Sequence, residues 1–189
     1  GYAGFGRRWR IEPRLPAAAA DPGLRDRVVA VVPARNEATE LPRTLGALLA
    51  QRYARLHVVL VDDHSDDGTA DVARAIAAAQ GAADRLTVIA APELPPGWTG
   101  KVWAQQQGVP RALALDADWI WLTDADIHHA PDVLARLLGT AHARGRDLVS
   151  IMARLRCATA FERLLIPAFT YFFAMIYSFV GGLLPASIL

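Results

Sequence analysis

The sequence predicts an α/β fold with a mostly parallel, doubly wound sheet. Apolar runs typical of strands occur at 28–33, 57–62, 86–90, 119–123 and 147–152. These runs are nearly continuous in Val, Ile and Leu, which indicates strands that are covered on both faces. Segments of helical pattern separate them, and repeated units of strand and helix place the strands parallel in one sheet.

The expected helices lie between the strand runs. They cover about 37–51, 67–80, 100–114 and 131–144. The last of them has a recognisable start in Pro131 and Asp132, because proline is favourable in the first turn of a helix.

The composition excludes several classes of protein. The chain has 189 residues and a net charge of +1, without a strongly basic stripe, so we expect no nucleic-acid partner. The single cysteine, Cys157, excludes an internal disulfide and a zinc site built from several cysteines.

The two ends of the chain differ from its middle. Residues 1–27 form an arm with basic and aromatic side chains, which suits either a membrane–water interface or a mobile terminus. The α/β domain is assigned to 28–158, and 159–189 to an apolar helical segment. The stretch 164–189 contains no charged residue and is long enough to span a bilayer. Because Pro167 and other breakers interrupt it, the alternatives are a helix lying in the membrane interface and a broken helix packed on a domain, and membrane contact is favoured over a buried core helix.

Polar segments follow four of the expected strands. They are 33–37, 62–69, 91–101 and 124–129. Ligands of doubly wound sheets bind at the carboxyl ends of the strands. We therefore expect these four segments to converge on one binding site.

The first segment reads Pro33, Ala34, Arg35, Asn36 and Glu37. It has no glycine, whereas a dinucleotide fingerprint needs glycines so that the backbone can approach a pyrophosphate. One interpretation is that Asn36 caps the next helix, with Glu37 in its first turn. The alternative is that this segment grips a base and ribose.

The second segment holds four carboxylates in six residues. Asp62 and Asp63 stand at the strand end, where a carboxylate can accept from a uracil N–H or a ribose hydroxyl. Ser65 or Asp66 is expected to cap the following helix.

The third segment ends in Lys101, the only lysine among twenty basic residues. A lysine at a helix start on this edge of the sheet could neutralise a phosphate. The backbone around it is adaptable because of Gly97 and Gly100. The alternative is an exposed surface lysine.

The fourth segment begins with Asp124-Ala125-Asp126. Residues two apart on an extended chain face the same side, so both carboxylates can address one centre. Mg²⁺ takes carboxylates together with phosphate oxygens and water, and would stabilise a departing diphosphate. The alternative is that the aspartates cap the next helix. His128 and His129 could add a ligand, but adjacent loop histidines usually face solvent.

Taken together, these motifs resemble the family 2 glycosyltransferases of GT-A fold. "VVPARNE", "VVLVDDHSDDGTADVA" and "WLTDADI" stand in the order and spacing of that family. "PPGWTGKVWAQQQG" and "ERLLIPAFTYFFAMIY" are similar to the hopanoid-biosynthesis-associated branch, which is related to ceramide-glucosyltransferase-like enzymes. The resemblance covers about 28–180 and implies a Rossmann-like GT-A domain that binds a nucleotide sugar.

The resemblance also implies roles for individual residues. The segment 33–37, with Asp62 or Asp63, would bind the nucleoside of the donor, commonly UDP. Lys101 would lie near the base or the diphosphate. Asp124 would approach the ribose and the metal, and Asp126 would be the main ligand of Mg²⁺ or Mn²⁺.

The activity that the resemblance implies is an inverting transfer of a sugar to a lipid acceptor, hopanoid-related, at the cytoplasmic face of a bacterial inner membrane. The general base of the family is an aspartate, and we expect it beyond Leu189. Asp147 is expected at a strand start, away from the carboxyl edge, and Glu162 has no assigned place. A non-catalytic, nucleotide-binding and membrane-associated module is therefore the alternative function.

Overall fold

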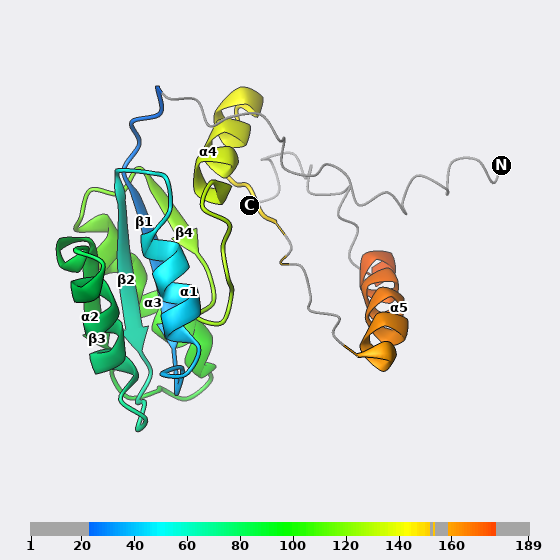
Figure 1. Cartoon of the computed structure of the whole chain (residues 1–189), viewed down its shortest axis with the longest axis horizontal. Helices are drawn as coiled ribbons and strands as arrows, with labels where there is room; N and C mark the ends of the chain where they lie inside the picture. The colour runs from blue at the N-terminus through cyan, green and yellow to red at the C-terminus, as the bar shows by residue number, and fades with distance from the viewer. Residues whose placement is uncertain (1–22, 152, 154–158, 177–189) are drawn as a thin grey trace. The chain divides into compact units, whose positions relative to one another are not determined.

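The computed structural model describes residues 23–151, 153 and 159–176 of the chain (Figure 1). It divides into two units, and the sheet with its helices falls within 17–149. Helix α5 (Ala160–Ile176) belongs to the other unit and is described by itself.

The sheet has four strands, all parallel, in the order β3-β2-β1-β4. Their bounds are β1 (Val28–Ala34), β2 (Leu56–Asp62), β3 (Leu86–Ala90) and β4 (Trp119–Leu122). The chain adds β2 and β3 on one side of β1 and then crosses to add β4 on the other side. The strand order therefore reverses between β1 and β4, which makes this the switch point of the sheet.

Four helices lie in the connections after the strands. They are α1 (Leu41–Leu49), α2 (Thr69–Ala79), α3 (Gly100–Leu113) and α4 (Val133–Arg144), with a short 3-10 helix η2 (Ala83–Arg85) before β3. Pro42, in the first turn of α1, is in a position that proline favours. Gly145, with a φ of 55°, ends α4 in the left-handed conformation that glycine adopts at low cost.

Two apolar layers cover the sheet, one on each face. Alternate residues of β1 divide between them, because successive strand side chains point to opposite faces. Val28, Ala30 and Val32 pack in the layer that includes residues of α1, α2 and α4. Val29 and Val31 pack in the other layer, which includes residues of α3. Figure 1 shows α1 in front of the sheet. The continuous valine run is thus explained by burial on both faces.

The predicted parallel α/β fold is confirmed, but the prediction of a fifth strand is wrong. Residues 147–151 of the expected strand 147–152 form no strand, and residue 152 lies outside the described part. The side chain of Leu148 is 84% exposed, so this run does not bury the apolar face that would stabilise a strand. The expected helix 37–51 is also shorter, since α1 begins only at Leu41.

Helix α5 begins with a reciprocal pair of hydrogen bonds. The backbone N–H of Thr159 donates to Oε2 of Glu162 at 2.8 Å, and the backbone N–H of Glu162 donates to Oγ1 of Thr159 at 3.2 Å. This capping box gives Glu162 a structural place. Among the described residues, no helix combines the length and apolar character needed to cross a bilayer. Residues 1–22 and 177–189, which include most of the predicted arm and the end of the apolar segment, lie outside the described part.

Candidate functional site

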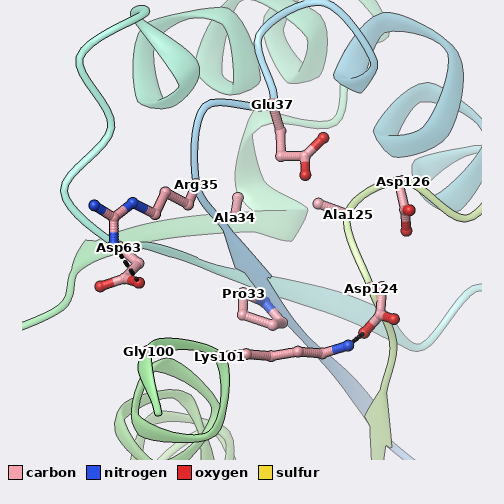
Figure 2. A pocket seen from close by; sticks show the side chains of 10 residues that line it. All are labelled: Pro33, Ala34, Arg35, Glu37, Asp63, Gly100, Lys101, Asp124, Ala125 and Asp126. Carbon is pink, nitrogen blue, oxygen red and sulfur yellow. Dashed lines mark ion pairs between the residues drawn. The ribbon is translucent and has the colours of Figure 1, made fainter.

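A cavity of about 420 Å³ opens at the carboxyl edge of the sheet, at the switch point between β1 and β4 (Figure 2). Its lining comprises Pro33, Ala34, Arg35, Glu37, Asp63, Gly100, Lys101, Asp124, Ala125 and Asp126. These residues come from the ends of β1, β2 and β4 and from the start of α3. The predicted convergence of the four segments is therefore confirmed. Asn36 and Asp62, both proposed from the sequence as ligand contacts, are not part of this lining.

Asn36 joins the segment after β1 to the segment after β2. Its backbone N–H donates to Oγ of Ser65 at 3.0 Å, and its Oδ1 accepts from the backbone N–H of Asp66 at 3.0 Å. Its φ of 56° lies in the left-handed region, which asparagine tolerates better than most residues. Asn36 therefore holds the two loops in register and does not cap α1, whose N-cap is Glu40.

Asp67 strengthens the same junction. Its Oδ1 accepts from the backbone N–H and the hydroxyl of Thr69, at 2.9 and 2.5 Å, and its Oδ2 accepts from the backbone N–H of Ala38 at 2.9 Å. The hydrogen bond from the Thr69 hydroxyl is the main reason why the pKa of Asp67 is lowered. The expectation that Ser65 or Asp66 caps the next helix is wrong, because the N-cap of α2 is Gly68.

The two aspartates at the end of β2 have different surroundings. Oδ1 of Asp62 accepts from the backbone N–H of Ser65 at 3.2 Å, outside the cavity. Asp63 lines the cavity and its side chain is only 9% exposed. A terminal guanidinium nitrogen of Arg35 lies 3.7 Å from Asp63, and Nδ1 of His64 lies 3.2 Å from it. Asp63 thus presents a carboxylate to the cavity from a nearly buried position.

Helix α3 approaches Asp63 closely through a residue without a side chain. A Cβ placed on Gly100 would lie 2.6 Å from Oδ2 of Asp63, closer than real Cβ contacts. Gly100 is the first residue of α3, so the carboxylate lies at a helix N-terminus, where negative charge is stabilised. Glycine at this position therefore lets the helix and the carboxylate share one wall of the cavity.

Lys101 extends across the cavity to Asp124 (Figure 2). Its Nζ lies 2.7 Å from Oδ1 of Asp124, and the two side chains are 57% and 38% exposed. The ion pair joins the start of α3 to the segment after β4. Lys101 is exposed, as the alternative interpretation predicted, but its ammonium group is paired with the acidic segment.

Asp126 and Glu37 are the remaining acidic groups of the lining. Burial raises the pKa of Glu37, and the negative charge of Asp126 raises it further. Neither Asp124 nor Asp126 caps the next helix, because the N-cap of α4 is Asp132. Glu37 and Asp126 carry like charges, and a cation bound between them would reduce their repulsion.

His129 lies at the end of the segment that begins with Asp124 and Asp126. Its side chain is buried and Nε2 lies 2.8 Å from Oγ1 of Thr123, which is also buried. Burial lowers its pKa to about 4, with a smaller contribution from the neighbouring His128. The expectation of a solvent-facing His129 is wrong, whereas His128 is exposed. The ring of His129 packs against that of Trp121 in β4, with the two ring centroids 4.6 Å apart.

The chemistry of the lining fits a hard divalent cation. Asp124, Asp126 and Glu37 offer carboxylate oxygens, which Mg²⁺ and Mn²⁺ prefer. In the part of the chain that the structure describes, no group of three or more acidic, histidine or cysteine side chains is arranged to hold a metal by itself. Such a lining suits a metal whose coordination is completed by substrate phosphates and water.

The fold and the cavity define a class of protein, namely the α/β proteins that bind a ligand at the switch point of a parallel sheet. Comparison with known families makes the class specific. The family model "Glycosyl transferase family 2" matches residues 29–178, and the chain belongs to this family.

The solved structures that resemble the chain include the following two. The mannosyltransferase PcManGT from Pyrobaculum calidifontis, in complex with GDP-Man and Mn²⁺, is 29% identical with a TM-score of 0.54. The match covers 74% of this chain and 39% of that one. S. aureus TarS 1-349 in complex with UDP-GlcNAc is 21% identical with a TM-score of 0.50, over 63% of this chain and 32% of that one. The chain thus spans less than half the length of these relatives, and the second likeness concerns the fold alone.

Proposed function

We propose that the chain is the donor-binding part of a glycosyltransferase that moves a sugar from a nucleotide sugar, UDP-linked, to a lipid acceptor. One observation carries the proposal. A single lysine and the two carboxylates of Asp124 and Asp126 face one cavity at the switch point of the sheet. A nucleotide sugar carries the matching groups, since its diphosphate can take both the ammonium and a metal held by carboxylates.

The nucleoside would bind on the β2 side of the cavity. Asp63 offers only acceptor oxygens, which suit the imide N–H of uracil or a ribose hydroxyl. Arg35, which is 66% exposed, can stack on or pair with the ligand from the rim. Asn36 and Asp62 would support this arrangement through the hydrogen bonds that connect the loops, without touching the nucleoside.

The diphosphate and the metal would bind on the β4 side. Asp126 would be the main ligand of Mg²⁺ or Mn²⁺, with Asp124 beside it and Lys101 on the phosphate oxygens. The metal, when bound, would neutralise charge on the departing diphosphate. The structure of PcManGT was solved with Mn²⁺ and GDP-Man, which supports a divalent metal in a related donor site.

In the proposed reaction an acceptor hydroxyl attacks the anomeric carbon, and the bond from that carbon to the β-phosphate oxygen breaks. The electron pair leaves with UDP, and the configuration at the anomeric carbon inverts. Lys101 would stabilise the charge that develops on the leaving group, and a cation held by Asp124 and Asp126 would add to this stabilisation. The proton of the hydroxyl passes to a general base. Glu162 is engaged in the capping box of α5.

The acceptor is proposed to be a membrane lipid, hopanoid-related, reached from the cytoplasmic face of a bacterial inner membrane. The first part of α5 exposes large apolar side chains, namely Phe161, Leu164, Leu165 and Phe169. Exposed apolar surface of this kind marks interaction sites with lipid or protein. Flotation of the chain with vesicles made from bacterial lipids, compared with Leu164→Glu, would test this part. Equal flotation of both would contradict it.

The donor site is tested by measuring UDP affinity by titration calorimetry, with and without Mn²⁺. We expect Mn²⁺ to tighten UDP binding, and Asp126→Ala to remove that gain. Asp66→Ala is the matched control, because Asp66 is an exposed carboxylate of the neighbouring loop that does not line the cavity. Metal-dependent binding by Asp126→Ala equal to wild type would refute the metal assignment. Failure of the folded wild type to bind UDP or GDP in either condition would refute the donor site.

A further inference from the structure

The ion pair between Lys101 and Asp124 lies inside the proposed donor site. Nζ of Lys101 is 2.7 Å from Oδ1 of Asp124, and both residues line the cavity (Figure 2). The carboxylate of Asp124, which would face a metal, is thus paired with the only lysine of the chain. A cation and an anion that both belong to the ligand-binding lining neutralise each other.

This arrangement opposes the binding of a metal on its own. A divalent ion that approaches Asp124 meets the ammonium group at contact distance, and the two cations repel. The ion pair is also easy to break, because both side chains are more than one third exposed and exposed pairs are weak. The pair therefore weakens metal binding without closing the site permanently.

A diphosphate is a second anion with which the ammonium group of Lys101 can pair, in place of Asp124. Lysine carries three donors on a flexible stem of four carbons, so Nζ can turn from a carboxylate to phosphate oxygens without movement of α3. Once Lys101 has turned, both oxygens of Asp124 become available to a metal. The same movement removes a positive charge from the carboxylate and adds it to the phosphate.

We infer that Lys101 is a placeholder cation, which neutralises Asp124 in the free protein and passes to the diphosphate when the donor and the metal bind. The inference rests on the proposed donor site and adds that the binding of the nucleotide and the binding of the metal depend on each other. Metal alone binds weakly. The nucleotide strengthens metal binding both by direct coordination and by drawing Lys101 away from Asp124. Lys101 is in this respect a positioning residue for the metal as well as a phosphate ligand.

Arg35 provides a matched control within the same cavity. It also carries one positive charge and lines the cavity, but its guanidinium lies near Asp63, at 3.7 Å, on the β2 side. Removing Arg35 lowers the positive charge of the cavity as much as removing Lys101 does. It does not release Asp124. Comparison of the two variants therefore distinguishes the release of Asp124 by Lys101 from the general effect of removing one positive charge from the cavity.

The test measures the affinity for Mn²⁺ alone by electron paramagnetic resonance of the free ion, in wild type, Lys101→Met and Arg35→Met. We expect Lys101→Met to bind Mn²⁺ about tenfold more tightly than wild type, because the competing ammonium is gone. Arg35→Met should stay within about twofold of wild type. In metal-free buffer, Lys101→Met should bind UDP more weakly than wild type, since the phosphate has lost its partner.

Mn²⁺ affinity that is unchanged in Lys101→Met, or raised equally in both variants, would overturn the exchange. A structural role for Lys101 would not tighten metal binding, so the direction of the change is itself diagnostic. UDP titrations of the wild type with Mn²⁺ separate the two proposals. If the wild type binds Mn²⁺ and UDP together but Lys101→Met has no higher affinity for Mn²⁺ than the wild type, only the exchange is refuted. If the wild type does not bind UDP, the proposed donor site fails and the exchange fails with it.

Discussion

Thr123 and His129 are joined by a hydrogen bond of 2.8 Å that closes the loop carrying Asp124 and Asp126. Both partners are buried, and the imidazole packs against the ring of Trp121. The two ends of the loop that presents the carboxylates are therefore joined to each other, and the His129 end also packs against β4. Because burial disfavours the charged imidazole, the pKa of His129 is lowered to about 4, and the ring is neutral near pH 7.

The first prediction concerns stability at mildly acidic pH. Unfolded His129 has a pKa near 6.5, so between pH 6.5 and about 4 the unfolded chain binds a proton that the folded chain does not. The stability that depends on neutral His129 is thus present above pH 6.5 and is lost as the pH falls through this window. The loss amounts to at most about 3 kcal/mol. Urea denaturation at a series of pH values measures it.

Two variants isolate the contribution of His129. His129→Gln should be less stable than wild type at pH 7, because it loses ring packing, but its stability should decline less between pH 6.5 and 4. His128→Gln should keep most of the wild-type decline, because burial is the larger cause of the lowered pKa of His129 and His128 contributes less. An identical pH dependence in His129→Gln and wild type would contradict the assignment.

The second prediction concerns the packing of α3 on the sheet. A Cβ on Gly108 would lie 2.3 Å from Cγ1 of Val31 and 3.0 Å from Cγ2 of Val61, both fully buried. Gly108→Ala should therefore lower the free energy of unfolding by about 1–3 kcal/mol through overpacking. Gly139 is the control, since it lies inside α4 with no atom within 4 Å of an added Cβ. Gly139→Ala should raise stability by up to about 1 kcal/mol, because alanine favours helix. Chemical denaturation gives both values, and equal effects would refute the close approach.

The sheet could be predicted from the sequence because its signal is local and strong. The valine runs of β1 and β2 are buried on both faces, and burial on both faces requires such continuous apolar sequence. The run at 147–152 is also rich in apolar residues, although it includes Asp147 and Ser150, and residues 147–151 form no strand. Composition reports that a segment can form a strand, whereas pairing with a neighbour decides whether it does.

The cavity was predictable in its position but not in its contacts. Polar residues after parallel strands meet at one edge, so the spacing alone predicted that Asp63, Lys101 and Asp126 would converge. Which carboxylate of a cluster faces the ligand depends on loop conformation. Asn36, with its positive φ, and Asp67, with its hydrogen bonds to Thr69, use their side chains to hold loops together. Several residues of these acidic and polar segments are of the right type for either role, and only the folded geometry separates them.

The third prediction concerns the close approach of α3 to Asp63. Gly100→Ala would place a methyl group 2.6 Å from Oδ2 of a carboxylate that is nearly buried, so either the carboxylate or the helix start must move. We expect UDP affinity to fall on the order of tenfold, because Asp63 loses its orientation. Titration calorimetry measures the loss, and circular dichroism confirms that the variant is folded. Gly139→Ala should leave UDP affinity unchanged, and an unchanged affinity in Gly100→Ala would exclude Asp63 as a positioned ligand group.

The fourth prediction concerns the charge of Glu37 beside Asp126. Burial, and then the carboxylate of Asp126, raise the pKa of Glu37, so the folded state binds the proton of this carboxyl more strongly than the unfolded state. The associated stability is present at low pH and is lost as the pH rises through the folded pKa. Glu37→Gln cannot ionise and should therefore have a higher Tm than wild type at pH 7 in metal-free buffer.

The difference in Tm between Glu37→Gln and wild type should shrink as the pH is lowered below the ordinary pKa of a glutamate, because wild-type Glu37 is then protonated as well. Mn²⁺ should stabilise the wild type more than the variant, since a cation relieves the repulsion that only the wild type has. Glu93→Gln is the control, because Glu93 is an exposed carboxylate outside the cavity lining, and its Tm should follow that of the wild type at every pH. Differential scanning calorimetry across pH, with and without Mn²⁺, measures these differences. A lower Tm for Glu37→Gln than for wild type at pH 7 would show that the carboxylate stabilises the metal-free cavity, contrary to the repulsion argued from its raised pKa.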